Sequence, residues 1–220
     1  MTLHVGDKNI VDVRYGNAKI ARIYKGGNLL YGYQPSEVLF ESSTAGTYQL
    51  YVKCRCKLSF IAVGGGGGGS CNGTYYANNI TANVGGGGGS GAYVYGTLEV
   101  FAGTYTITVG SAGSFGRGVN NVPPIRGSDG TSSVVFGQVA GGGGGSLGNS
   151  GGYGGSAGIA QTAYGFVNGN VGTLSPVYPA VGGYPLITAA GGASVYNGYG
   201  LGGNGDSTPA TGGYVKITAV

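Results

Sequence analysis

Side chains that could carry out catalysis are few in this chain and lie far apart in the sequence. The only histidine is His4, and after residue 63 the only carboxylates are Glu99, Asp129 and Asp206. General acid–base catalysis needs titratable groups within hydrogen-bond reach of the same substrate atoms. Nothing in this spacing brings two such groups together, so the sequence favours a protein that is not an enzyme.

Two stretches, 148–152 and 154–158, match the G-x-S-x-G pattern of a nucleophilic serine. Such a serine lies on a tight turn between a strand and a helix. No segment here repeats its apolar residues with helical spacing. A sequence this rich in glycine and serine also matches the pattern by chance. We therefore expect no serine nucleophile and no catalytic residue of another kind.

Three cysteines, Cys54, Cys56 and Cys71, are the remaining reactive side chains. An odd number argues against a secreted domain held together by disulfides. A structural zinc site takes four ligands, and only the distant His4 could complete a set with the three thiols. The sequence predicts three reduced cysteines with no metal and no other cofactor, and a bridge from Cys71 to one of the other two is the alternative.

The composition limits the class of protein more strongly than any motif. Of 220 residues, 53 are glycine, 18 are tyrosine and 6 are phenylalanine, while only 8% are charged and the net charge is +4. Collagen needs glycine at every third position, and disordered tracts have few aromatic residues and high net charge. The chain fits neither class.

The same composition limits the partners. A net charge of +4 with scattered basic residues gives little electrostatic attraction for nucleic acid. No apolar run is long enough for a transmembrane helix, and residues 1–20 show no secretory leader. We expect no nucleic-acid binding and no membrane insertion.

The chain divides into two unequal parts. Of 18 charged residues (11 basic and 7 acidic), 12 precede residue 64, whereas 47 of the 53 glycines follow residue 63. We predict an all-β fold with a small N-terminal β-domain at 1–44 and a glycine-rich domain at 45–220. Alternating β-forming residues predict strands at 10–15, 18–24, 29–31, 37–42, 46–63 with a break near Lys53, 104–109, 132–140 and 214–220.

Long glycine runs interrupt the second part, at 64–69, 85–89 and 141–145, with looser runs at 151–155, 191–192 and 202–205. Glycine is costly to order, so these runs are either flexible linkers or a packed layer. Polyproline II segments without side chains can pack side by side and join their backbones by hydrogen bonds, with three residues per turn. We favour packed polyglycine II helices that display the segments between them as loops, because linkers rarely carry apolar strands such as 104–109.

The order of these elements resembles the glycine-rich domain of bacteriophage tail-fibre and receptor-binding proteins. The resemblance covers about 45–220 and rests on SFIAV (59–63) followed by six glycines, GGGGGSGAYV (85–94), AGTYTITVGSAG (102–113), GSDGTSSVVF (127–136), AGGGGGS (140–146) and GGYVKITAV (212–220). It implies a polyglycine II sandwich in the style of the T-even tail-fibre-tip adhesins, whose loops contact a receptor on the bacterial surface.

The resemblance also implies a location and partners. Residues 19–31 look like a short β-module of phage and prophage tail proteins, so we expect 1–44 to attach the chain to other tail or virion proteins. The implied location is the virion, in a tail fibre or at another exposed position. The receptor is an outer-surface protein or a glycan, and both a single copy and a homotrimer are open.

Segments between the glycine runs are rich in tyrosine, asparagine, serine and glycine, the residues that antibody loops use for contact. One segment, 113–126, adds two arginines beside an aromatic residue, a combination enriched at binding hot spots. The alternatives to receptor contact are that the tyrosines pack over glycine layers and that the arginines only keep a loop soluble. The candidate receptor contacts are Tyr75, Tyr76, Asn78, Asn79, Phe115, Arg117, Asn120, Arg126, Tyr196 and Tyr199.

Two other functions compete with an adhesin. A structural virion component, such as a fibre, head-decoration or baseplate piece, could use the glycine-rich domain for assembly. An ice-binding or wall protein would need a flat, regular face of short residues, and the bulky, irregular tyrosine segments argue against it.

Overall fold

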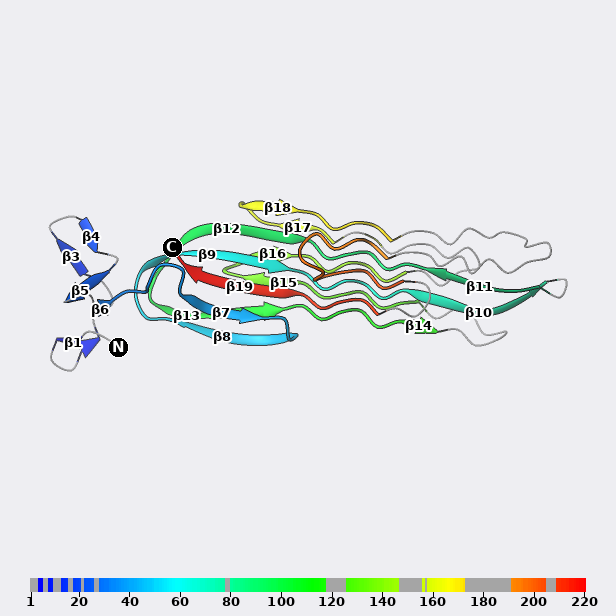
Figure 1. Cartoon of the computed structure of the whole chain (residues 1–220), viewed down its shortest axis with the longest axis horizontal. Helices are drawn as coiled ribbons and strands as arrows, with labels where there is room; N and C mark the ends of the chain where they lie inside the picture. Colours follow the sequence, from blue (N-terminus) through cyan, green and yellow to red (C-terminus); the bar gives the residue numbers. More distant parts are fainter. Residues whose placement is uncertain are drawn as a thin grey trace.

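The structure of the chain is a computed structural model, elongated and made of strands and extended segments (Figure 1). It describes residues 4–5, 8–9, 13–15, 18–20, 22–25, 28–77, 80–117, 126–146, 156, 158–172, 191–204 and 209–220. Within these residues there are strands, turns and no helix. The all-β prediction is confirmed.

Three two-stranded antiparallel hairpins form the N-terminal part, at one end of the molecule (Figure 1). They pair β1 (His4–Val5) with β2 (Lys8–Asn9), β3 (Val13–Tyr15) with β4 (Ala18–Ile20), and β5 (Ile23–Lys25) with β6 (Asn28–Tyr31). The division between residues 44 and 45 stays a prediction. β7 (Val38–Ser42), which precedes it, pairs with the last strand of the chain.

Two five-stranded antiparallel sheets face each other in a sandwich. The first has the order β18 (Gly165–Val167), β12 (Tyr93–Val100), β9 (Cys56–Val63), β19 (Tyr214–Ala219) and β7. The second has the order β17 (Ala160–Gln161), β16 (Gln138–Ala140), β15 (Ser133–Val135), β13 (Gly103–Val109) and β8 (Gly46–Val52). Residues 53–55 separate β8 from β9, which confirms the break expected near Lys53.

Alternating apolar side chains form the core between the sheets. Along β9, Cys56, Leu58 and Phe60 point inward and are buried, because successive side chains of a strand face opposite sides. The Phe60 ring packs edge-on against the rings of Phe136 and Tyr164, with centroids 6.4 and 5.5 Å away. This core holds the strands from which the glycine segments extend.

One predicted strand proves to be two. The sequence predicted a single strand over 132–140, but β15 and β16 form a hairpin there. Its turn residues, Phe136 and Gly137, have φ angles of 49° and 77°, the left-handed region that a tight two-residue hairpin turn requires. Phenylalanine gives no sign of a turn in a sequence, so only Gly137 could have indicated one.

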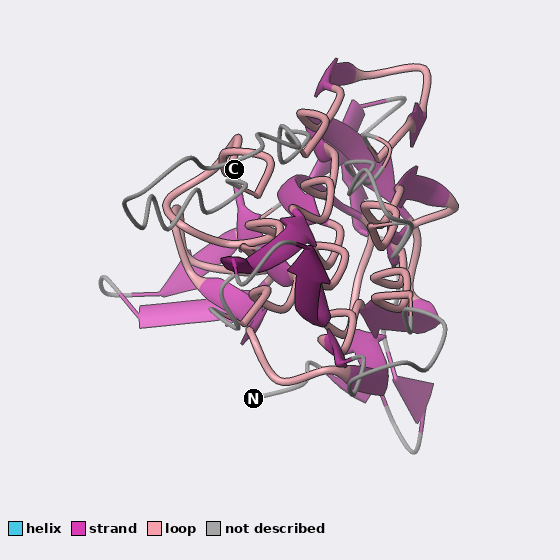
Figure 2. Cartoon of the chain, turned by 90° about the vertical axis from the view of Figure 1, so that its right-hand side faces the viewer, coloured by secondary structure: helices cyan, strands magenta, loops and turns pink. Residues whose placement is uncertain are grey.

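Ten extended segments, which we call glycine rods, together form the glycine bundle beside the sandwich (Figures 1 and 2). Eight of them continue strands of the sandwich, and the turn at 194–199 joins the other two, 191–193 and 200–204. The described residues of these rods are 64–69, 87–92, 110–115, 126–132, 141–146, 156 with 158–159, 168–172, 191–193, 200–204 and 209–213. None of them belongs to a sheet. The rods run alternately away from the sandwich and back to it.

Hydrogen bonding between rods repeats every three residues, the period of a polyproline II helix. In rod 64–69 the donor amides go to three neighbours in turn: Gly64 and Gly67 to rod 87–92, Gly65 and Gly68 to rod 126–132, and Gly66 to rod 209–213. Its carbonyls accept from three others, rods 110–115, 141–146 and 200–204. Rod 64–69 therefore has six neighbours and lies inside the bundle.

Rod 87–92 is the second interior rod. It also exchanges backbone hydrogen bonds with six neighbours, rods 64–69, 141–146, 156–159, 168–172, 191–193 and 200–204. The sequence predicted that glycine runs would stack in this way. It placed Gly85 and Gly86 in such a run, whereas the structure places both at the end of β11 (Ile80–Gly86).

Close packing excludes side chains from rod 64–69. A Cβ atom added to any of Gly64 to Gly69 would lie 1.9–2.2 Å from a backbone carbonyl oxygen of a neighbouring rod. Real Cβ atoms do not approach that closely, so rod 64–69 accepts only glycine, whereas rod 87–92 also holds the small buried side chains of Ser90 and Ala92. The glycine runs are thus required by packing.

At the distal end, away from the sandwich, the two interior rods run into a small sheet. Rod 64–69 continues into β10 (Ser70–Ala77), and β11 leads into rod 87–92. β10 lies between β11 and β14 (Gly116–Arg117), antiparallel to the first and parallel to the second. In Figure 1 the β10–β11 hairpin extends beyond the other labelled strands.

Candidate binding surfaces

The distal end gathers the joining segments between rods. Because rods leave the sandwich and return alternately, five joining segments have both ends fixed here: 70–86, 116–125, 147–155, 173–190 and 205–208. Of these, the structure describes 70–77, 80–86 and 116–117. Their sequences carry only two charged residues, Arg117 and Asp206. Each rod that ends here is joined to neighbouring rods by backbone hydrogen bonds.

Six of the ten predicted contact residues belong to these distal segments. Tyr75 and Tyr76 lie in β10, in register with Ala82 and Thr81 of β11, and Arg117 lies in β14. The positions of these three side chains are outside the described part of the structure. Asn78, Asn79 and Asn120 lie outside the described residues altogether.

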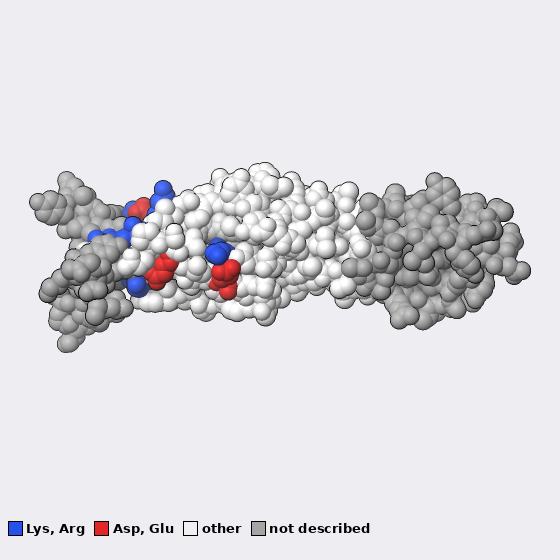
Figure 3. Space-filling view, in the orientation of Figure 1, with Lys and Arg blue, Asp and Glu red and all other residues white. Residues whose placement is uncertain are grey.

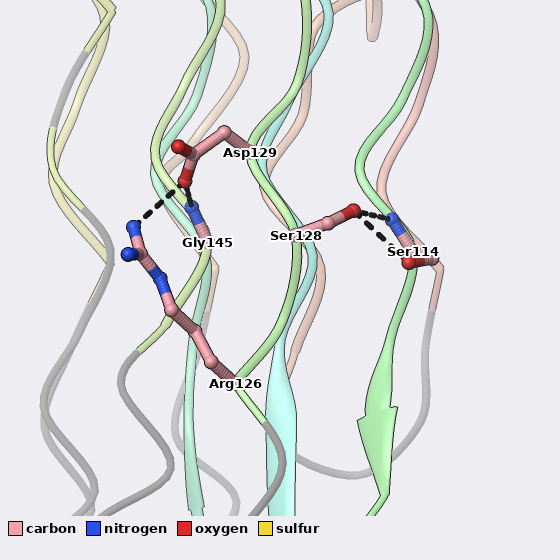
Figure 4. Close-up of polar contacts among 5 residues, drawn as sticks. All are labelled: Ser114, Arg126, Ser128, Asp129 and Gly145. Atoms are coloured by element: carbon pink, nitrogen blue, oxygen red, sulfur yellow. Dashed lines mark hydrogen bonds and ion pairs between the residues drawn. The ribbon is translucent and has the colours of Figure 1, made fainter.

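Phe115 and Arg126 end the two rods that enclose one distal segment. Phe115 is half-buried at the end of rod 110–115, and Arg126 is exposed at the start of rod 126–132. Arg126 donates to Asp129 Oδ1 over 2.9 Å, and the same oxygen accepts the Gly145 N–H over 2.7 Å (Figure 4). Arg126 therefore neutralises a carboxylate that takes the place of a backbone acceptor.

Hydroxyl groups play the same part between rods 110–115 and 126–132. Ser128 N–H donates to the Ser114 carbonyl, while Ser114 N–H donates to the Ser128 hydroxyl over 2.7 Å (Figure 4). Ser111 and Thr131 repeat the pattern three residues away. Side-chain oxygens at the edge of the bundle thus accept amides that have no neighbouring backbone to bond, which is the requirement that buried amides impose.

Tyr196 and Tyr199 lie elsewhere. They flank the turn between rods 191–193 and 200–204, at the sandwich end, so the structure does not bring them to the distal end with Tyr75 and Tyr76. They belong instead to a row of stacked rings, which we call the tyrosine row, on the first sheet. Its members in order are Tyr95, Tyr93, Tyr196, Tyr214 and Tyr199, with ring centroids 4.9, 4.9, 5.9 and 4.5 Å apart.

The tyrosine row is anchored at Tyr214 and open at Tyr95. Tyr214 is 7% exposed and donates its hydroxyl to Glu41 Oε1 over 2.6 Å, while Lys216 pairs with Glu41 over 3.0 Å. Burial and the hydrogen bond to Glu41 raise the pKa of Tyr214. The bond from Tyr214 and the one from Lys216 lower the pKa of Glu41. Tyr95 is 44% exposed, so one end of the row faces solvent.

Charges gather at the opposite end of the molecule, over the sandwich. Figure 3 shows the charged side chains of one face there and none on the white stretch that follows. Arg55 pairs with Glu99 and lies over the Phe101 ring, 4.6 Å from its centroid. Phe101 and Tyr51 are 59% and 61% exposed. Arg55 and Phe101 form a proximal patch that combines apolar surface with charge, and Tyr51 exposes a further ring on β8.

Cys54 and Cys56 are free thiols buried beside this patch. A hydrogen bond from Cys56 lowers the pKa of Cys54, and the same bond raises the pKa of Cys56. Tyr33 nearby accepts the Lys53 N–H, and burial raises its pKa to about 12. The Cys71 side chain lies outside the described part.

Within the described residues, no three His, Cys, Asp or Glu side chains are grouped so that they could hold a metal ion. Nor does that part of the chain contain a helix long and apolar enough to cross a membrane.

Residues 42–219 match the family model of the glycine-rich domain. Since the match spans most of the chain, the protein belongs to this glycine-rich domain family. No curated protein matches the chain.

Sequence reasoning missed several residues of these surfaces. Rods 110–115 and 126–132 have no glycine run, but glycine recurs at every third position, in Gly110, Gly113 and Gly116 and again in Gly127 and Gly130. That spacing matches the three-residue turn and could have identified both rods. The tyrosine row has no such signal, because Tyr93, Tyr196 and Tyr214 come from three distant segments.

Proposed function

We propose that this protein is a phage tail-fibre-associated adhesin that binds a receptor on the bacterial surface through the segments joined at the distal end of its glycine bundle. The N-terminal hairpins would attach it to other tail or virion proteins. The proposal places the chain on the exposed surface of a virion and assigns it no catalytic step.

One observation carries the proposal: five joining segments start and end on a rigid lattice at the end farthest from the N-terminal hairpins. Rigid scaffolds that hold variable segments are a general design for recognition. Here the rods are joined to their neighbours by backbone hydrogen bonds, which follow a three-residue register in the two interior rods, so the segments can differ in sequence without disturbing their anchors. Tyrosine, asparagine and serine supply contacts at low entropic cost.

The direct test uses the labelled chain on a panel of bacterial strains, with bound protein measured by flow cytometry and phage adsorption measured in competition. We expect saturable binding to a subset of strains and reduced phage adsorption on those strains. Absence of binding to every strain whose phage adsorption depends on this protein would contradict the proposal.

Matched variants separate the two ends. A distal variant carries alanine at Tyr75, Tyr76, Arg117 and Arg126, and a proximal variant carries alanine at Tyr51, Arg55 and Phe101. We expect the distal variant to lose cell binding while the proximal variant retains it, with circular dichroism confirming that both are folded. Equal binding by the two variants would remove the distal end from the proposal.

The second candidate is a structural virion protein that uses the glycine-rich domain for assembly. The proximal patch favours it, because Phe101 exposes a large aromatic surface beside Arg55, a combination common at protein interfaces. The two functions differ in one outcome. If the protein serves only in assembly, the proximal variant should fail to enter virions. Virions that carry the distal variant should then still adsorb to cells.

A further inference from the structure

The turn that ends the tyrosine row has a defined geometry. Tyr199 N–H donates to the Tyr196 carbonyl over 2.9 Å, and the two residues between them, Asn197 and Gly198, have φ angles of 45° and 81°. Two central residues with positive φ make this a type I′ turn, for which Asn-Gly is the preferred pair. Both central residues are exposed.

We propose that Asn197 is a site of spontaneous deamidation, preferred over Asn168 and Asn204, which also precede glycine, and that the reaction opens this turn. The Gly198 amide nitrogen attacks Cγ of Asn197, the new C–N bond closes a five-membered imide, and the Cγ–Nδ2 bond breaks to release ammonia. Water then opens the imide at either carbonyl, giving aspartate or its β-linked isomer. The reaction consumes one water and needs no enzyme or oxidant.

The surroundings of the turn leave both reacting groups free. A Cβ atom added at Gly198 would meet nothing within 4 Å, so there is space for the ring to close. Within the described part of the chain, neither the Gly198 N–H nor the Asn197 side chain makes a hydrogen bond. A turn at the surface also opens at lower free energy than a packed strand.

At Asn168, which precedes Gly169, both reacting groups already make hydrogen bonds. Its Oδ1 accepts the Ala160 N–H over 3.0 Å, which fixes the amide that would be attacked. The Gly169 N–H, which would attack, donates to the Gly158 carbonyl over 2.9 Å. Cyclisation at Asn168 would therefore break two hydrogen bonds of the bundle edge.

Asn204, which precedes Gly205, has its side chain engaged as well. Its Oδ1 accepts the Gly191 N–H over 2.7 Å and joins rod 200–204 to rod 191–193. This is the substitution of a side-chain oxygen for a backbone acceptor that Asp129 makes elsewhere in the bundle. Of these three asparagines, Asn197 alone has a side chain that makes no hydrogen bond within the described residues.

The β-linked product would change the tyrosine row. It inserts one extra atom into the backbone between Tyr196 and Tyr199, so the 2.9 Å turn bond cannot form in its present geometry. The Gly198 carbonyl accepts the Thr211 hydroxyl over 2.8 Å, and Thr211 in turn accepts the Leu201 N–H. We expect Tyr196 and Tyr199 to leave Tyr214, which they now cover.

The test incubates the full chain in neutral and in mildly alkaline buffer, with a denatured sample as reference, and follows all three sites by peptide mapping and mass spectrometry. In the folded chain we expect the mass change that marks replacement of NH by O to appear first at Asn197, several-fold faster than at Asn168 or Asn204. The rate at Asn197 should be higher in alkaline buffer. In the denatured chain the three rates should converge. A folded-state rate at Asn168 or Asn204 equal to that at Asn197 would overturn the ranking.

A variant separates the new charge from the new backbone atom. Asn197→Asp adds the carboxylate and keeps the normal linkage, so we expect its near-ultraviolet circular dichroism to resemble that of the fresh chain. Aged protein rich in the β-linked isomer should lose part of the tyrosine signal. An aged sample with an unchanged tyrosine signal would show that the turn stays closed, and the structural half of the inference would be wrong.

Discussion

The sandwich and the glycine bundle are formed by consecutive segments of one chain, yet they exclude water in opposite ways. In the sandwich, Leu58 and Phe60 of β9 are almost fully buried against apolar side chains from both sheets. In the bundle, the next residues along the chain, 64–69, are buried with no side chains at all. A dry interior can thus be built from backbone alone, provided that neighbours on all sides accept and donate every hydrogen bond.

The change from one regime to the other takes place within a few residues. β9 ends at Val63 with side chains alternating every two residues, and rod 64–69 begins at once with partners repeating every three. At this junction Ser133 donates to the Val63 carbonyl over 2.6 Å and accepts the Gly110 N–H over 2.9 Å. Large side chains stabilise one side of the junction, and the absence of side chains stabilises the other.

The sharpest way to test this contrast is to add a single methyl group to the bundle. A Cβ on Gly67 would lie 2.1 Å from the Gly144 carbonyl oxygen. Backbone hydrogen bonds to Gly89 hold both Gly67 and Gly144 in place. We expect Gly67→Ala to lower the free energy of unfolding by more than about 4 kcal/mol, or to prevent folding. Thermal and denaturant unfolding followed by circular dichroism measures the loss.

Gly212→Ala is the matched control. Its Cβ would lie 3.6 Å from the Gly110 carbonyl oxygen, an ordinary contact. Alanine also restricts the unfolded chain, so we expect a change within about 1 kcal/mol. Similar losses in Gly67→Ala and Gly212→Ala would contradict the steric account of the bundle.

The opposite change tests the sandwich. Phe60→Ala removes a ring that is 1% exposed and packs against Phe136 and Tyr164. We expect a loss of about 3–5 kcal/mol, against less than about 0.5 kcal/mol for Tyr51→Ala at an exposed position. Because rods and strands are continuous, both regions should unfold in one transition, and two separate transitions in calorimetry would show that they are independent.

The junction itself should show a smaller effect. Ser133→Ala leaves the buried Gly110 N–H and the Val63 carbonyl without their hydroxyl partner. An unsatisfied buried polar group costs about 1–3 kcal/mol, and we expect a loss in that range. Ser133→Thr keeps the hydroxyl, so hydrogen exchange at Gly110 should accelerate in the alanine variant and much less in the threonine variant.

At the edge of the bundle the effects decrease further. Asp129→Ala removes the acceptor of the Gly145 N–H, and we expect a loss of about 1 kcal/mol. Arg126→Ala removes only an exposed ion pair and should cost less than about 1 kcal/mol. Denaturant midpoints compare the two, and an equal or larger loss for Arg126→Ala would assign the arginine a role that this geometry does not give it.

The smallest expected effect is a dependence on pH. Hydrogen bonds from Tyr214 and Lys216 lower the pKa of Glu41 below its ordinary value. A carboxyl group with a lowered folded-state pKa stabilises the fold above its unfolded-state pKa, and this stabilisation is lost as the pH falls through the folded-state pKa. Acid titration of wild type and Glu41→Gln should therefore converge at low pH. Parallel curves would show that Glu41 contributes nothing.

Much of the fold follows from local sequence pattern. The alternation in 104–109 and 214–220 marked β13 and β19, and the runs at 64–69 and 141–145 marked two rods, because both patterns follow the period of their own structure. β12 was not predicted, because the alternation that begins with Tyr93, Val94 and Tyr95 follows directly on a glycine run. The period of a sequence pattern identifies a strand or a rod, but not the elements that pack beside it.

The candidate surfaces were less predictable, for a physical reason. Tyr196 and Tyr199 were grouped with Tyr75 and Tyr76 on composition, but the rod direction puts the first pair at the sandwich end. Direction depends on how many rods precede a segment, and rods 110–115 and 126–132 were not recognised. Asp129 was likewise missed, because its role depends on Gly145 of another rod.

The three-residue register of rod 64–69 also restricts how the gene for this protein can change. Inserting one or two codons within the rod would turn every following amide toward a different neighbour, whereas three codons would restore the original partners after one turn. The joining segments at the distal end carry no such restriction. Length variation in related genes should therefore occur in multiples of three codons in the rods and without any preferred multiple in the joining segments.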